Sequence, residues 1–223
     1  MDIKLFFQAI IKFVLGFVIV GVLIFVPAGT FNYWNAWLFM GLLFIPMFFA
    51  GIILMVKNPE LLKKRLNAKE KENEQKVVIL LSSLMFLSGF IIAGLNFRFC
   101  WIIIPKFIVI ISSVLFVISY IMYAEVLKEN TYLSRTIEVQ ENQKLIDTGL
   151  YGVVRHPMYS ATILLFLTIP LILGSIISFI IFCAYPIIIS KRIKNEEEVL
   201  EKELNGYKEY KNKVKYKLIP FIW

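Results

Sequence analysis

The sequence has a single histidine and only two cysteines among its 223 residues. With so few soft ligands and no Cys-x-x-Cys pair, it can build neither a zinc site nor a disulfide framework, so we expect no metal. The Gly-x-Gly-x-x-Gly fingerprint of a Rossmann domain is also absent. Acidic residues are few, with 16 Asp and Glu against 24 Lys and Arg, and the formal net charge is +8.

Apolar residues are abundant instead, at 59% of the chain, and the mean hydropathy is +0.75. Soluble domains do not carry several apolar runs of membrane length, so the composition predicts an all-α, polytopic integral membrane protein. The basic residues lie beside these runs, as the positive-inside rule describes. We therefore expect membrane lipids, and no nucleic acid, as the partners of this charge.

Four apolar segments have the roughly 20 residues that a membrane-spanning helix needs: Leu5–Val26, Ala36–Val56, Val77–Leu95 and Trp101–Tyr123. No small-residue cleavage site follows the first, so we predict that it is a retained helix. Lys12 and Lys106 are expected to snorkel to the membrane surface. A fifth run, 158–190, is too long for one crossing, and Pro170 and Gly174 divide it, which predicts a membrane helical hairpin.

Three polar segments separate or follow these runs: the loop 57–76, which has a short helix starting near Pro59, the connector 124–157 and the tail 191–223. Together they hold 20 of the 24 Lys and Arg residues. The positive-inside rule then places them, both termini and the active site in the cytoplasm. We divide the chain into an N-terminal transmembrane region, 1–123, and a C-terminal core, 124–223.

The only histidine stands in the sequence Arg155-His156-Pro157-Met158-Tyr159, where the connector meets the apolar hairpin. Proline suits the first turn of a helix because it lacks an N–H group, so Arg155 and His156 are expected at a helix N-terminus. Such an end attracts anions, including carboxylates. Interfacial anchoring, with Arg155 on lipid phosphate and Tyr159 in the aromatic belt, explains the same residues as well.

Further polar features flank the hairpin. Gly149 follows a polar pair and predicts a sharp turn. Arg192 and Glu196 are four residues apart and share one helix face, whereas Glu197 points away from both. A surface ion pair of this kind stabilises a protein by only ~0.3–0.5 kcal/mol, but its position directly after a membrane hairpin favours a pocket. Gly206–Tyr210 and the apolar end predict an amphipathic cytoplasmic tail.

Taken in order, these pieces resemble the isoprenylcysteine carboxyl methyltransferase family, which is related to phospholipid N-methyltransferases. The family pattern has Gly-x-Tyr, Arg-His-Pro-x-Tyr, an apolar hairpin, Arg with a Glu-Glu pair, a Gly segment with two Tyr, and a Pro-Phe-Ile-like end. The matching parts are Gly149–Tyr151, Arg155–Tyr159, Arg192 with Glu196 and Glu197, Gly206–Tyr210 and Pro220–Ile222. The resemblance covers roughly Lys144 to the end. Many family members have His where this chain has Gln143 or Lys144.

The resemblance implies that S-adenosyl-L-methionine is the cofactor. It assigns the cofactor site to Lys144, Leu145, Ile146, Tyr151, His156, Pro157, Met158, Tyr159 and Glu196. His156 and the helix N-terminus would meet the cofactor's carboxylate, and Glu196 would accept hydrogen bonds from its hydroxyl or amino groups. Arg192 would hold the acceptor's carboxylate, since a guanidinium gives a bidentate orientation that Lys does not.

The reaction that this implies is carboxyl O-methylation of a lipophilic small-molecule or prenylated substrate that enters from the lipid side. A carboxylate is already ionised at neutral pH and needs only to be oriented. An amine, the acceptor of a phospholipid N-methyltransferase, needs a base, for which Glu197 is the candidate. The sequence is also compatible with an NADPH-dependent membrane reductase and with a non-enzymatic membrane protein.

Overall fold

The computed structural model describes residues 3–66, 73–133 and 139–223, and parts of the predicted charged loop and connector lie outside them. Within these ranges every regular element is helical, which confirms the predicted all-α fold. The long helices are α1 (Ile3–Ala28), α2 (Trp34–Lys57), α4 (Asn73–Phe99), α5 (Lys106–Glu129), α6 (Pro157–Ile172) and α8 (Tyr185–Glu203). The short ones are α3 (Pro59–Leu66), the 3-10 turn η1 (Gly149–Gly152), α7 (Ile176–Phe182) and α9 (Tyr207–Lys213).

Five stretches of the described chain are long and apolar enough to cross a membrane, and they support an integral membrane protein. Four of them, α1, α2, most of α4, and α5, correspond to the four predicted spans. The fifth runs through α7 and α8, and α6 is a shorter apolar helix beside it. Helices α6, α7 and α8 lie where the sequence predicts the membrane hairpin. The short helix α3 begins at Pro59, as predicted.

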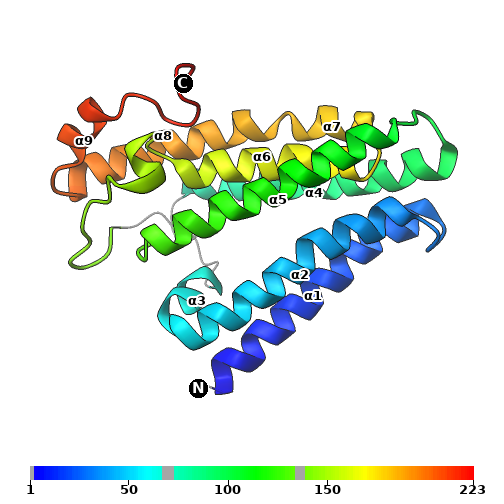
Figure 1. The fold of residues 1–223 in the computed structure, drawn as a ribbon, viewed down its shortest axis with the longest axis horizontal. Helices are drawn as coiled ribbons and strands as arrows, with labels where there is room; N and C mark the ends of the chain where they lie inside the picture. Colours follow the sequence, from blue (N-terminus) through cyan, green and yellow to red (C-terminus); the bar gives the residue numbers. More distant parts are fainter. Residues whose placement is uncertain (1–2, 67–72, 134–138) are drawn as a thin grey trace.

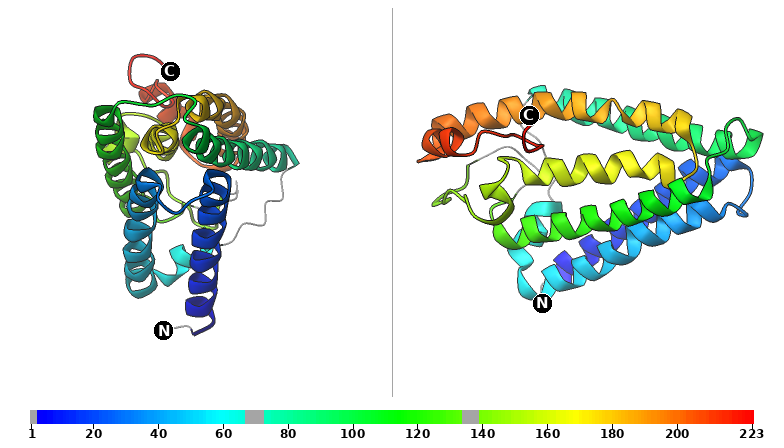
Figure 2. Two further views of the ribbon diagram at one scale, coloured as in Figure 1. Left: turned by 90° about the vertical axis from the view of Figure 1, so that its right-hand side faces the viewer. Right: turned by 45° about the horizontal axis from the view of Figure 1, so that its top comes forward.

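The helices run roughly lengthwise through the molecule, so that its polar segments gather at one end (Figure 1). Helix α5 packs on α6, α1 packs on α4, and α4 also contacts α7 and α8. The N-terminus, α3 and α9 lie at the same end, and the turns α1–α2 and α4–α5 lie at the other. Figure 2 shows that α1 and α2 diverge from the other helices toward the end that holds the N-terminus and α3. Which side of a membrane this end faces stays a prediction.

Helix α5 begins at Lys106, five residues later than the sequence predicts. Residues 101–104 are not helical, and Pro105 precedes the helix with extended backbone angles (φ −58°, ψ 142°). Proline disfavours helical backbone in the residue before it, which explains the delayed start. Lys106 is therefore the first residue of the helix and not one turn inside it. The Lys12 ammonium donates to the carbonyl of Leu66 at the end of α3 (2.5 Å).

The hairpin turns at Gly174, which adopts a positive φ of 78°. Pro170, expected at the division, lies inside α6 instead, because that helix continues to Ile172. The second arm is broken, since α7 ends at Phe182 and α8 begins at Tyr185. A proline occupies the first turn of α8, where its missing N–H group interrupts the helical hydrogen bonds. The hairpin predicted from the sequence does not include this break.

The turn between α6 and α7 is tied to α2 by buried side chains. The Tyr33 hydroxyl donates to the carbonyl of Leu173, and the Asn35 amide donates to that of Ile172 (2.7 Å). Tyr33 is 1% exposed, so these bonds are shielded from solvent. They fix the far end of α6, whose near end carries the candidate site.

Candidate active site

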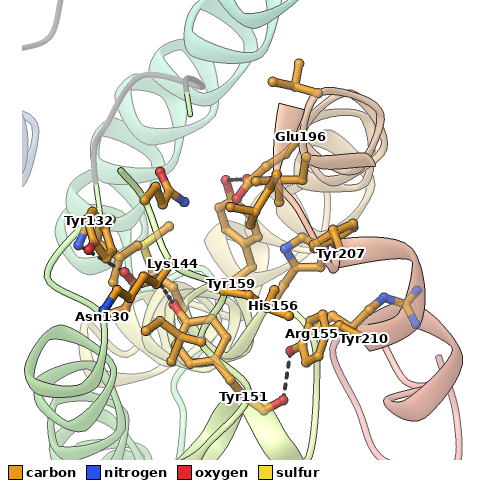
Figure 3. A pocket seen from close by; sticks show the side chains of 18 of the residues that line it. Asn130, Tyr132, Lys144, Tyr151, Arg155, His156, Tyr159, Glu196, Tyr207 and Tyr210 are labelled. Atoms are coloured by element: carbon orange, nitrogen blue, oxygen red, sulfur yellow. Dashed lines mark hydrogen bonds between the residues drawn. The ribbon is translucent and has the colours of Figure 1, made fainter. Parts of the chain in front are cut away.

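A pocket lies at the polar end of the bundle, between the connector, the start of α6, and α8 with α9. The space inside it is about 870 Å³, a volume that includes open solvent at its mouth. The connector residues Asn130, Tyr132 and Lys144 lie across the pocket from Glu196 and Tyr207 (Figure 3). The lining residues are Asn130, Tyr132, Leu133, Gln143, Lys144, Leu145, Ile146, Tyr151, Arg155, His156, Met158, Tyr159, Arg192, Glu196, Val199, Leu200, Leu204, Tyr207 and Tyr210.

The start of α6 confirms the helix N-terminus predicted at the histidine. His156 occupies the N-cap position, and Pro157 is the first helical residue. The C-terminal tail binds the backbone just before this helix. The N–H of Arg155 donates to the carbonyl of Tyr216, and that of His156 to the carbonyl of Lys217, both at 2.9 Å. The N–H group of His156 is thus already bonded within the protein.

A hydrogen-bonded chain joins α4, α6 and α8 at the pocket wall. The Tyr159 hydroxyl donates to a carboxylate oxygen of Glu196. The Arg192 Nε donates to the same hydroxyl at 2.9 Å, and its Nη1 donates to the Gln75 Oε1 at 3.0 Å. The structure therefore brings the predicted Arg192 and Glu196 together with Tyr159, across the hairpin. The contact from Gln75 was not predicted.

A second charged cluster is buried beside the pocket, and two of its members, Arg155 and His156, also line it. Glu197 is 5% exposed, and its Oε1 accepts from the Arg155 Nε at 2.8 Å and lies 3.2 Å from the His156 Nε2. Its Oε2 lies 3.2 Å from the Lys217 ammonium. Arg155 Nη1 also donates to the carbonyls of Val214 and the following residue, at 2.7 and 2.8 Å. Helix α8, the start of α6 and the tail are thus joined through one carboxylate.

The connector wall is built around Tyr151, which lies in the η1 turn. Gly149 starts this turn with a φ of +55°, as the predicted sharp turn requires. The Tyr151 hydroxyl accepts from the Asn130 amide at 2.9 Å, and the Tyr151 carbonyl accepts from the Tyr210 hydroxyl at 2.7 Å. Burial raises the pKa of Tyr151 to about 12, while the bond from Asn130 opposes this rise. The side chain therefore remains neutral at physiological pH.

Most residues of the predicted cofactor site line this one pocket: Lys144, Leu145, Ile146, Tyr151, His156, Met158, Tyr159 and Glu196. Arg192 lines it as well. Two predicted residues are not among the lining set: Pro157, within the first turn of α6, and Glu197, in the buried cluster. Sequence reasoning did not assign Asn130, Tyr132, Tyr207 or Tyr210. The spacing of the tail tyrosines Tyr207 and Tyr210, three residues apart, is a sequence pattern that could have indicated both of them.

The pocket offers carboxylate, hydroxyl, imidazole and ammonium groups beside apolar side chains from α8. The described residues contain no group of three His, Cys, Asp or Glu side chains that could hold a metal ion. Such a mixed lining suits an organic ligand with both polar and apolar parts.

Residues 101–206 match the family model of phospholipid methyltransferases. The match begins before the span expected from the motifs and includes α5, and it ends before α9. This similarity supports a membrane methyltransferase, and it does not separate carboxyl O-methyltransferases from phospholipid N-methyltransferases. No curated protein matches the chain.

Proposed function

We propose that this protein transfers a methyl group from S-adenosyl-L-methionine to a lipophilic carboxylate, in the manner of isoprenylcysteine carboxyl methyltransferases. The observation that carries the proposal is the chain from Arg192 through Tyr159 to Glu196 at the pocket wall. It puts a guanidinium and a carboxylate of α8 side by side, both bonded to one hydroxyl of α6 that the hairpin separates from them in sequence. An interfacial anchor has no need of this link.

The lining residues fit a cofactor that carries a nucleoside and an amino acid. Glu196 presents a carboxylate that accepts hydrogen bonds from hydroxyl or amino groups, and Lys144 and His156 present nitrogen groups for a carboxylate. Leu145, Ile146 and Met158 supply apolar contact area for a base. S-adenosyl-L-methionine, when bound, supplies a methyl group on a positively charged sulfur.

Arg192 is the residue that orients the acceptor. Its guanidinium is positioned by Tyr159 and Gln75, which limits the rotamers it adopts. In carboxyl transfer the acceptor oxygen forms a bond to the methyl carbon while the carbon–sulfur bond breaks, so no proton has to be removed. Methylation of an amine needs a base, and the Glu197 carboxylate is already bonded to Arg155 and Lys217. This arrangement favours the carboxylate acceptor.

The remaining assignments follow from the position of the pocket. All its lining residues lie between Asn130 and Tyr210, which supports residues 124–223 as the catalytic core and residues 1–123 as the transmembrane region. We place this end of the bundle in the cytoplasm, on the charge of its segments. The acceptor, a lipophilic small molecule or a prenylated substrate, enters from the surrounding lipids.

Titration calorimetry of the purified protein with S-adenosylhomocysteine tests the cofactor. An absence of binding up to millimolar ligand overturns the proposal. If the ligand binds, the Arg192→Ala variant should bind S-adenosylhomocysteine as tightly as the wild type but should not transfer the methyl group, because Arg192 orients the methyl acceptor. Glu196→Ala should weaken S-adenosylhomocysteine binding, because the Glu196 carboxylate faces the cofactor. The opposite pattern means that the two roles are exchanged.

A phospholipid N-methyltransferase is the second candidate, because the matching family model is described as that of phospholipid methyltransferases. Labelled methyl donor separates the two reactions: product in phospholipid headgroups identifies the N-methyltransferase, and base-labile methyl esters identify the O-methyltransferase. A membrane reductase would bind NADPH and ignore S-adenosylhomocysteine. A non-enzymatic protein would bind neither.

A further inference from the structure

A buried tyrosine hydroxyl at the pocket has no hydrogen-bond partner. Tyr207, in α9, is 3% exposed and lines the pocket, yet its Oη atom finds no partner among the described residues. An unpaired buried hydroxyl costs about 1–3 kcal/mol in proteins. A phenylalanine at this position would avoid the cost, so the hydroxyl has no structural role in the ligand-free protein.

The neighbouring tyrosines are bonded in the ordinary way. Tyr210, one turn later, donates to the carbonyl of Tyr151, and Tyr159 donates to Glu196. Tyr207 packs on Tyr210, with ring centroids 5.7 Å apart, in a small apolar cluster that includes Leu204 and Leu145. This packing holds the Tyr207 ring in place among the residues that line the pocket (Figure 3).

From this contrast we infer that Tyr207 is a binding residue whose hydroxyl forms a hydrogen bond with the adenosyl ligand of the pocket. Burial raises the pKa of Tyr207 above its ordinary value, and the nearby Glu197 and Glu196 raise it further. The hydroxyl is therefore protonated and can both donate and accept. This inference rests on the proposed function and adds α9 to the ligand site, beyond the part that matches the family model.

Tyr207→Phe tests the inference because it removes only the oxygen. We expect S-adenosylhomocysteine to bind about three- to tenfold more weakly, the usual effect of one hydrogen bond. The melting temperature of the ligand-free variant should equal or exceed that of the wild type, since an unpaired polar atom has been removed. Weaker binding together with undiminished stability is the signature of a ligand contact.

Tyr185→Phe is the matched control. Tyr185 is also buried, but its hydroxyl donates to Thr162 at 3.3 Å, and it does not line the pocket. This variant should keep wild-type affinity. If Tyr207→Phe also keeps wild-type affinity, the hydroxyl does not contact the ligand and the inference is overturned. If the wild type itself binds no S-adenosylhomocysteine, the proposed function fails first, so the two failures are distinguishable.

Discussion

The buried carboxylate of Glu197 gives the sharpest test of how the site is held together. Its oxygens contact Arg155, His156 and Lys217, and its side chain is 6% exposed. Glu197→Ala leaves the Arg155 guanidinium, 5% exposed, without its counter-charge. Breaking a buried ion pair in this way costs about 3–5 kcal/mol. We expect a loss of that size in the free energy of unfolding, measured in mixed micelles.

Glu198→Ala is the control for this variant, because the next glutamate along α8 is exposed. Its effect should stay within about 0.5 kcal/mol. Replacing both partners, with Arg155→Met and Glu197→Leu, should be less harmful than the sum of the two single changes, since no charge is left buried. If Glu197→Ala keeps full stability and cofactor affinity but loses methyl transfer, Glu197 is the base predicted from the sequence, and the structural reasoning is refuted.

Three further changes test the packing and the acceptor side, the first two by unfolding measurements. Gly94→Ala should lower the free energy of unfolding by about 1–3 kcal/mol, because a Cβ there would lie 2.5 Å from a backbone oxygen of α1. Gly51→Ala is the control and should leave the stability unchanged, because a Cβ at that position meets nothing within 4 Å. Gly149→Ala should cost about 1–2 kcal/mol, since its φ is +55° and a Cβ would lie 3.2 Å from a carboxylate of α5. Gln75→Leu should raise the KM for the methyl-accepting substrate while leaving S-adenosylhomocysteine affinity unchanged, because it removes the side-chain oxygen to which the Arg192 guanidinium donates a hydrogen bond. Equal KM values for the variant and the wild type would show that Gln75 does not position the guanidinium.

The membrane helices could be predicted because each depends on local composition. An apolar run of about 20 residues is a helix in lipid whatever surrounds it, and all four predicted spans have a helix. The start of α6 was equally local, since Pro157 marks it. The break between α7 and α8 was missed because the apolar run continues through it, although Pro186 in the first turn of α8 is a sequence signal for it.

The parts of the site that were not predicted depend on contacts between distant segments. Gln75 falls in the stretch expected to be a loop, but α4 begins before it and carries it to Arg192, 117 residues later. The pairing of Arg155 with Glu197 likewise joins two helices, and neither residue type indicates the other. A single sequence shows which residues share a helix face, and it does not show which faces meet.

The adjacent Glu196 and Glu197 now have separate structural positions. Consecutive helical residues point about 100° apart, so Glu196 reaches Tyr159 at the pocket while Glu197, which does not line the pocket, reaches Arg155. Both partners belong to the same five-residue stretch at the start of α6. Two parallel links therefore set the position of α8 against α6. The buried bond between Arg155 and Glu197 holds the helix that carries Glu196. Loss of Glu197 should therefore also lower the affinity for the cofactor, although Glu197 does not line the pocket.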